Sequence, residues 1–280
     1  MLLDSILIVI TLIVLFIASY VDLKSREVPD WLSYAFVFAV LGIRFIFAVE
    51  QGWNIFWSGT VGFMVLFGLG YLFYWSSLWG GGDAKLLMGL GAAIGLPLPF
   101  SASSLNLVWF FLLVLCIGAI YGLVWLSYLA WLKKDLLFGQ FKKLVSQYKN
   151  MHFVLLILTL FVLILTIVNV LFWPLIFFPL GIFYLLLFVS LVEKSSFLQK
   201  VPLSSLTEGD WLAQEVKLKN QTIPRKTVSS KDLAFLQKSL PPSTLILIKV
   251  GIPFTPSFLF SYIAFLFGPQ FVPYLLSWVY

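Results

Sequence analysis

Residues 153–192 read FVLLILTLFVLILTIVNVLFWPLIFFPLGIFYLLLFVSLV, a stretch of forty residues without a charged side chain. At 1.5 Å per residue, one helix of this length would be about 60 Å long, roughly twice the ~30 Å hydrocarbon core of a bilayer. A proline also disfavours helical geometry at the residue before it, here Trp173. The stretch therefore predicts two membrane helices joined by a tight hairpin near Trp173–Pro174.

The composition of the whole chain indicates the same environment. Of 280 residues, 61% are hydrophobic and 11% are charged, whereas a soluble domain is about half apolar and about a quarter charged. The mean hydropathy is +1.02. These values exclude a soluble globular enzyme, a disordered chain and a disulfide scaffold. With one cysteine, Cys116, and one histidine, His152, a CxxC zinc site and a His-rich metal site are excluded, and we expect neither a metal nor a cofactor.

The predicted fold class is an all-α polytopic membrane protein with a small α+β module near the C-terminus. Eight apolar stretches are long enough to be candidate spans. They lie at about 3–21, 31–49, 55–78, 84–100, 106–131, 153–172, 174–192 and 256–279.

The basic residues predict the orientation of these spans. The first apolar stretch has no basic residue before it, which is untypical of a signal peptide and indicates a retained helix with its N-terminus outside. The inside segments then hold 17 of the 18 Lys and Arg residues, leaving only Arg44, as the positive-inside rule requires. These segments are 22–30, 79–85, 132–150 and 193–250. We therefore expect a multi-pass plasma-membrane protein that meets lipids and does not bind nucleic acid.

We predict five parts along the chain. They are a catalytic membrane core (1–131), an interfacial amphipathic segment (132–150), an extra transmembrane hairpin (151–192), a small cytoplasmic domain (193–250) and a C-terminal membrane helix (251–280). Apolar residues recur at helical spacing in 132–150 with lysines between them, which fits a helix on the inner leaflet; a cytoplasmic extension of the fifth helix is the alternative.

Segment 193–250 carries the signals of a small α+β module. Glu208–Gly209–Asp210 predicts a turn, followed by a strand around 211–218. Ser229 and Asp232 have the spacing of a capping box at the start of a short helix. Pro241–Pro242 ends that helix, and 244–250 is expected to form a strand.

Two acidic residues stand out from the rest. The other acids lie at span ends or in the module, whereas Asp22 directly follows the first span and Asp83 opens the fourth. The predicted topology places both at the same inner membrane boundary. Two carboxylates held close do not both ionise cheaply, so one keeps a proton while the other is charged. Such a pair can activate water and polarise a peptide carbonyl, which is the chemistry of an aspartic protease.

Glycines surround the second acid. Gly80–Gly82 permit positive φ and close backbone approach, and Asp83 is expected at a helix N-terminus. Small residues from Gly89 to Gly95 form a smooth face that could pack closely against the first helix and bring the two acids together. Gly118 and Gly122 form a further GxxxG pattern.

These motifs resemble those of the prepilin peptidases, and most closely the archaeal preflagellin peptidases. Residues 22–30 read DLKSREVPD, similar to the first motif of that family, in which an Asp ends the first helix before a basic loop and a Pro. Residues 80–87 read GGGDAKLL, similar to its GxGD motif. The EGD at 208–210 and the GIPF at 251–254 resemble a further pattern of the archaeal branch.

The resemblance implies an aspartic endopeptidase at the cytoplasmic membrane face, acting on precursors with a short basic leader before a hydrophobic helix. Asp22 and Asp83 match the catalytic pair. Gly80, Gly82, Lys85 and Pro29 match the supporting motif positions. The single cysteine argues against the zinc module and methyltransferase activity of the bacterial branch. The archaeal relatives commonly have six helices, so 151–192 is an extra hairpin.

Three alternatives remain open. A presenilin or signal-peptide-peptidase relative also uses GxGD, but its Pro-Ala-Leu element is absent here. A proton- or cation-coupled transporter would use Asp22 and Asp83 as carriers, and a scaffold for pilus assembly would need no catalysis. Lys85 is expected either to tune the charge of the site, to meet lipid phosphates or simply to snorkel to the interface. The sequence leaves the oligomeric state open.

Overall fold

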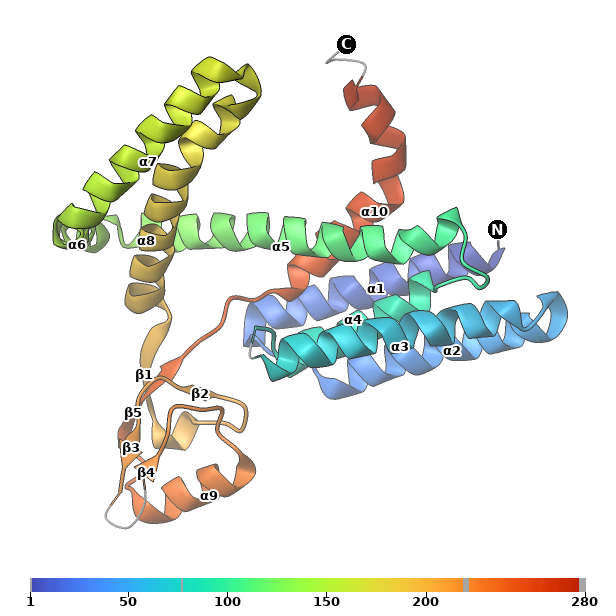
Figure 1. Cartoon of the computed structure of the whole chain (residues 1–280). Helices are drawn as coiled ribbons and strands as arrows, with labels where there is room; N and C mark the ends of the chain where they lie inside the picture. The colour runs from blue at the N-terminus through green and yellow to red at the C-terminus, as the bar shows by residue number, and fades with distance from the viewer. Residues whose placement is uncertain (1, 77, 219–221, 277–280) are drawn as a thin grey trace. The chain divides into compact units, whose positions relative to one another are not determined.

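The computed structural model describes residues 2–76, 78–218 and 222–276. The chain forms two compact units, Met1–Leu123 with Ile252–Tyr280, and Val124–Gly251. The first unit is helical and the second combines helices with small sheets (Figure 1). Helix α5 begins in the first unit and ends in the second. The helices of the first unit are α1 (Leu2–Ser25), α2 (Asp30–Gln51), α3 (Asn54–Trp75), α4 (Gly81–Ile94), the first part of α5 (Leu105–Leu132) and α10 (Thr255–Leu276).

Six helical stretches of the described residues are long and apolar enough to cross a membrane. They are Leu2–Ser25, Asp30–Gln51, Asn54–Trp75, Ala102–Leu132, Lys149–Val168 and Val170–Ser196. They confirm a mostly helical membrane protein, whereas the predicted count of eight spans is not confirmed. For the expected span 256–279, residues 277–279 lie outside the described residues, and α10 shows an apolar stretch over Thr255–Gly268.

The clearest difference between prediction and structure is at the expected span 84–100. Helix α4 has 14 residues, which gives about 21 Å at 1.5 Å per residue, less than the ~30 Å of a bilayer core. It ends at Gly95, whose φ is +75°, and the next residues are not helical. Leu96 then donates its N–H to the carbonyl of Ser58, near the start of α3. A short helix with an extended tail therefore runs antiparallel to α3 in place of one long helix.

Arg44 is the basic residue outside the predicted cytoplasmic segments, and it contacts the C-terminal end of α4. Its side chain is buried, and its two terminal nitrogens donate to the carbonyls of Ile55 and Ala93 at 3.0 and 2.8 Å. The carbonyls of the last helical turn lack partners within their helix and carry partial negative charge. The guanidinium of Arg44 therefore satisfies the C-terminal end of α4 where water is scarce.

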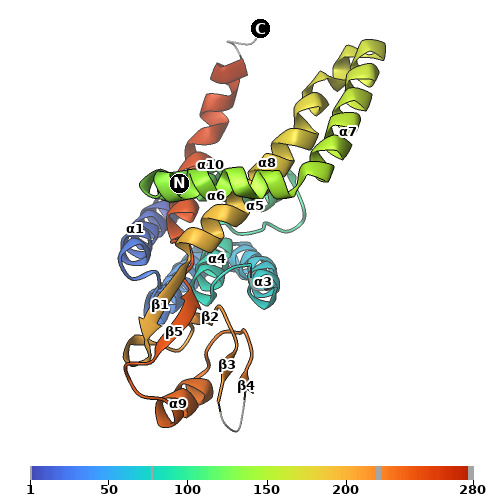
Figure 2. The same cartoon turned by 90° about the vertical axis from the view of Figure 1, so that its left-hand side faces the viewer.

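The second unit contains a helical hairpin and a separate amphipathic helix. Helices α7 (Lys149–Val168) and α8 (Phe178–Ser196) lie side by side, joined by η2 (Val170–Phe177) (Figures 1 and 2). Helix α7 ends at Val168, before Trp173–Pro174, and the side chain of the next residue, Asn169, accepts the N–H of Leu171 at the start of η2. Helix α6 (Lys134–Gln147) is separated from α5 by a break at Lys133, so it is not a straight extension of that helix.

The rest of the second unit is the α+β module that the sequence predicted. Strands β1 (Leu198–Pro202), β5 (Leu245–Lys249) and β2 (Trp211–Leu212) form an antiparallel sheet in the order β1-β5-β2. The expected strand at 211–218 is split, and β3 (Val216–Lys217) pairs instead with β4 (Thr222–Ile223). Helix α9 (Ser230–Ser239) completes the module. The module has its own core, formed by Leu203, Leu206, Leu212, Ile223, Val228, Leu236, Ile246 and Ile248.

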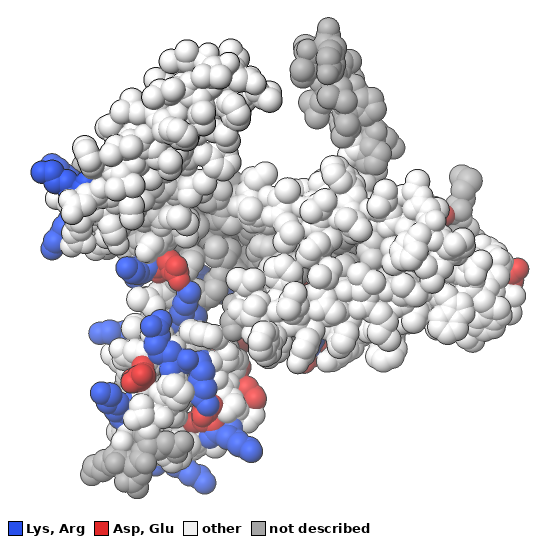
Figure 3. Space-filling view, in the orientation of Figure 1, with Lys and Arg blue, Asp and Glu red and all other residues white. Residues whose placement is uncertain are grey.

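Charge follows this division. In the face shown in Figure 3, Lys and Arg gather over the α+β module and near α6, whereas the surfaces of the long helices are almost free of charge. An uncharged helical surface suits a hydrocarbon surrounding, and a charged module suits water.

The capping box of α9 is confirmed and leads to a first prediction. The side chain of Ser229 accepts the N–H of Asp232, and the carboxylate of Asp232 accepts the N–H and the hydroxyl of Ser229. Substituting Ser229 with alanine is expected to destabilise the module by about 1 kcal/mol, the usual cost of losing such a cap. Urea unfolding of the detergent-solubilised chain, followed by circular dichroism, measures this loss. Ser204→Ala, on an exposed residue outside the cap, is the control; equal midpoints for both variants would contradict the prediction.

The same cap makes the module sensitive to acid. Hydrogen bonds from Lys226 and then Ser229 lower the pKa of Asp232 to about 2. A carboxylate whose folded pKa is depressed contributes stability above its unfolded pKa of about 3.9 and loses it as the pH falls towards 2. Asp232→Asn is therefore expected to remove part of the acid dependence between about pH 4 and pH 2. Unfolding curves at pH 7, 4 and 2.5 test this, and an unchanged dependence in the variant would contradict it.

Candidate active site

Asp22 lies on the buried stripe of α1. The buried residues of this helix recur every three or four positions, so Leu15, Ala18 and Asp22 share one face. The Asp22 residue is only 6% exposed. A carboxylate on an otherwise apolar inward face is costly unless it has partners. The sequence predicted Asp22 from its position after the apolar run, and the structure shows that it points into the helical unit.

The chain turns sharply after Asp22. Helix α1 ends at Ser25, and Arg26 adopts the left-handed conformation with φ +59°, donating its N–H to the carbonyl of Asp22 at 2.8 Å. A non-glycine residue in this conformation costs roughly 1 kcal/mol and occurs here at a helix C-terminus, where the left-handed region is usual. Pro29 then stands at the N-cap of α2. The short connection between α1 and α2 therefore stays close to Asp22.

Asp83 lies in the first turn of α4 and is half-buried. Gly80–Gly82 do not use the positive φ that glycine permits, since the positive-φ glycines among the described residues are Gly52, Gly95 and Gly209. What these glycines provide is space. A Cβ on Gly82 would lie 3.1 Å from the Cβ of Val28, and one on Gly80 would lie 3.5 Å from a carboxylate oxygen of Asp83. The glycines therefore let the loop after α1 and the start of α4 come together.

The small residues of α4 face α3 and α2, not mainly α1 as the sequence suggested. A Cβ on Gly91 would collide with the carbonyl of Gly62 on α3, and one on Gly89 would collide with the ring of Phe36 on α2. Helix α1 instead contacts α4 near the beginning of α4, where Ala18 of α1 packs with Leu86. Close packing of α4 on α3 thus fixes the helix, and an apolar contact near its beginning brings it to Asp22.

Thr255 joins the two acids. Its backbone N–H donates to Asp22 Oδ2 at 2.8 Å, and its hydroxyl donates to Asp83 Oδ1 at 3.4 Å. Thr255 is fully buried and is the first residue of α10. Two carboxylates far apart in the sequence therefore share one donor residue from a third helix. The sequence analysis missed Thr255; its only signal is its place directly after the GIPF stretch at 251–254.

Lys85 does not join this pair. Its ammonium forms an ion pair with Asp30 on α2 and lies 5.3 Å from the centroid of the Tyr34 ring. Both partners lie at the beginning of α2, so Lys85 links α4 to α2 beside the site. The pair is partly exposed to solvent, and such pairs contribute little stability.

The residues that can bind metals are scattered. Among residues 2–76, 78–218 and 222–276, no three or more His, Cys, Asp or Glu side chains lie where they could hold one ion. Cys116 is exposed on α5, and a ring nitrogen of His152 hydrogen-bonds the carbonyl of Tyr148. The carboxylates of Asp22 and Asp83 are therefore the chemistry that this site offers.

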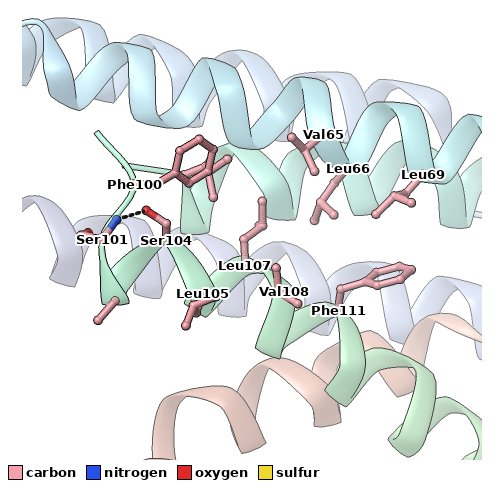
Figure 4. A pocket seen from close by; sticks show the side chains of 12 residues that line it. Val65, Leu66, Leu69, Phe100, Ser101, Ser104, Leu105, Leu107, Val108 and Phe111 are labelled. Carbon is pink, nitrogen blue, oxygen red and sulfur yellow. Dashed lines mark hydrogen bonds between the residues drawn. The ribbon is translucent and has the colours of Figure 1, made fainter. Parts of the chain in front are cut away.

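A large cavity lies elsewhere in the first unit, between α3 and α5 (Figure 4). Its volume is about 760 Å³, and its polar side chains are the hydroxyls of Ser101 and Ser104. The other lining residues are Val65, Leu66, Leu69, Leu96, Phe100, Ala102, Leu105, Leu107, Val108 and Phe111. This lining has no titratable group, so the cavity offers no acid or base.

Comparison with known proteins points to the same region. Residues 9–123, which contain both acids, give the deciding match. They match the type IV leader peptidase family. The resemblance to prepilin and preflagellin peptidases, predicted from the two Asp motifs, is thereby confirmed. The matched region covers α1 from residue 9 onward, α2 to α4 and the whole part of α5 that lies in the first unit, whereas Thr255 lies outside it.

Three preflagellin peptidases are similar to the chain. That of Methanococcus maripaludis is 33% identical over 147 residues, which are 50% of this chain and 63% of the relative. Those of Methanocaldococcus jannaschii and Methanococcus voltae are 40% identical over 82 residues and 36% identical over 129 residues. These matches cover 29% and 43% of this chain, and 34% and 54% of the relatives. The chain thus spans less than two thirds of each relative. No solved structure matches it significantly.

Proposed function

We propose that this protein is a membrane-embedded aspartic endopeptidase that removes short basic leaders from prepilin- or preflagellin-like precursors. The observation that carries the proposal is the meeting of Asp22 and Asp83 at Thr255. Both acids lie in the region that matches the type IV leader peptidases. The preflagellin peptidase relatives supply the substrate class, because their names describe proteins that act on preflagellins.

The proposed mechanism divides the work between the two carboxyl groups. The ionised carboxylate takes a proton from a water molecule as that water attacks the peptide carbonyl carbon. The protonated carboxyl donates a hydrogen bond, and then its proton, to the carbonyl oxygen. The tetrahedral intermediate collapses when the leaving nitrogen receives a proton and the C–N bond breaks. Water is consumed and a carboxylate and an amine are formed, so no other reactant is needed.

The proposed site lies at the cytoplasmic face. Most Lys and Arg residues belong to segments that the positive-inside rule assigns to that face, and Asp22 and Asp83 adjoin two of these segments. A precursor with a basic leader in the cytoplasm and an apolar helix in the bilayer would present its boundary at the same level. This arrangement also places the α+β module in the cytoplasm and the N-terminus outside.

The test is cleavage of a synthetic precursor by the purified chain in lipid vesicles. The substrate carries a short Lys/Arg-rich leader followed by an apolar helix, and mass spectrometry locates the cut. We expect cleavage at the boundary between leader and helix, and none of a substrate whose leader is neutral and Gly/Ser-rich. The same vesicles loaded with a pH dye test the transporter alternative. Proton flux that depends on Asp22 and Asp83, without cleavage, would favour a transporter and overturn the peptidase.

Topology gives an independent prediction. With Cys116 replaced by Ala, single cysteines at Gln140 and Glu215 are expected to react with a membrane-impermeant maleimide only after the cytoplasmic side is opened. A cysteine at Gln51, the last residue of α2, serves as the opposite control. This end of α2 faces outward in the proposed topology, so the cysteine is expected to react in intact cells. Labelling of position 215 in intact cells would contradict the prediction that segment 151–192 crosses the membrane twice.

A further inference from the structure

Thr255 makes two different contacts with the two acids. The backbone N–H can only donate and reaches Asp22, whereas the hydroxyl can donate or accept, reaches Asp83 and also contacts Asp22. A backbone N–H can only donate, so the Asp22 oxygen that it reaches has to act as an acceptor. A hydroxyl suits either a charged or a protonated carboxyl. Thr255 thus offers Asp22 a fixed donor that it does not offer Asp83.

The segment that carries Thr255 is rigid. Pro253 and Pro256 flank the Phe254–Thr255 pair, and each proline fixes its own backbone φ. Ser257 donates its N–H to the carbonyl of Phe254 at 2.9 Å, which closes the first turn. The hydroxyl of Thr255 is therefore presented from a backbone with little freedom.

Aromatic packing anchors this segment from behind. The ring of Phe254 occupies the space that a side chain on Gly118 would fill, since a Cβ there would lie 2.6 Å from the ring. The same ring lies 5.7 Å from the ring of Trp79, the residue before Gly80. The element that holds Thr255 and the loop that leads to Asp83 thus share one contact, so a shift of one displaces the other.

From this geometry we propose that Thr255 is a positioning residue for the catalytic pair, holding Asp22 and Asp83 in register and making their roles unequal. The inference rests on the proposed peptidase function. It assigns to α10 a part in the site that lies outside the family-matched region 9–123. The 3.4 Å hydroxyl contact is long, as hydrogen bonds in substrate-free sites often are, and is expected to shorten when substrate binds.

Two substitutions separate the hydroxyl from the packing. Thr255→Val keeps the shape and the backbone N–H but removes the hydroxyl, and Thr255→Ser keeps the hydroxyl. Loss of a hydrogen bond to a charged group corresponds to roughly a 10- to 100-fold effect. We therefore expect kcat of Thr255→Val to fall by about this factor with KM little changed, and Thr255→Ser to stay within about threefold of the parent chain. The rates are normalised to the concentration of folded protein, because a misfolded fraction would by itself lower the apparent kcat and leave KM unchanged.

A second readout needs no cleavage. A water-soluble carbodiimide modifies protonated carboxyl groups, and peptide mass spectrometry measures its rate at Asp22 and Asp83 separately. In Thr255→Val we expect the modification of Asp83 to speed up more than that of Asp22, because Asp22 keeps the backbone N–H of residue 255 and Asp83 keeps no donor from it. We expect unchanged rates in Thr255→Ser. If the parent chain cleaves no precursor but this pattern appears, the peptidase proposal fails and the pairing by Thr255 stands. Equal modification rates, or equal kcat values, in the parent chain and Thr255→Val would overturn the role of Thr255.

Discussion

Asp22→Asn and Asp83→Asn are each expected to lower the cleavage rate by on the order of 10²–10⁴-fold, the usual contribution of a general acid or base. Asparagine has nearly the shape of aspartate but neither takes up nor releases a proton at neutral pH. The 2.8 Å bond from the Thr255 N–H can still be accepted by the amide oxygen at position 22, so the fold is expected to persist. Cleavage of the synthetic precursor, followed with time, gives both rates.

The design includes a double variant and a matched control. Since the two acids act as a unit, the double variant is expected to be no slower than the slower single variant. Asp135→Asn changes an exposed acid at the start of α6 and is expected to cleave at the rate of the parent chain. Substantial cleavage by either single variant at position 22 or 83 would refute the two-carboxylate mechanism.

The largest structural effect is expected at Gly62. A Cβ there would collide with the carbonyl oxygen of Gly91 and would lie 2.9 Å from the Cα of Gly95. Both obstacles are backbone atoms, which cannot swing aside as a flexible side chain can. Gly62→Val therefore has to push α4 away from α3. Overpacking a well-packed interior costs typically about 1–3 kcal/mol, and a backbone collision belongs at or above the top of that range.

The control for this substitution is on the same helix. Gly68→Val adds the same side chain to α3, where a Cβ meets nothing within 4 Å. We expect Gly68→Val to melt close to the parent chain in detergent and Gly62→Val to melt many degrees lower, with loss of cleavage because α4 carries Asp83. Static light scattering during heating measures the melting of both variants. Equal melting of the two variants would show that α3 and α4 are not packed as described.

Charge placement made the two acids predictable. Few charged residues occur in this chain, and most have simple positions at span ends or in the module, so Asp22 and Asp83 stand out against the apolar runs beside them. The capping box at Ser229 could also be predicted from the sequence, because it depends on two side chains three residues apart. Patterns of this kind are local, and local patterns survive in the folded chain.

The features that the sequence did not reveal are long-range. Thr255 carries no charge, and its contacts appear only when α1, α4 and α10 meet. The sequence also did not show which helix packs against the small residues of α4, since a smooth face fits any close helix. The structure shows that this helix is α3, whose Gly62 packs against Gly91. The cap on the end of α4 is also long-range, because Arg44 comes from α2 and donates to the carbonyl of Ala93.

The position of Thr255 late in the sequence has a consequence during protein synthesis. Thr255 follows Asp83 by 172 residues, and a ribosome adding about 5–20 residues per second needs roughly 10–35 s to cover that distance. During this interval both carboxylates have been synthesised while the donor that links them does not yet exist. The proposed site is thus incomplete while the earlier helices are made, and it becomes complete only after α10 has been synthesised and has packed on α1.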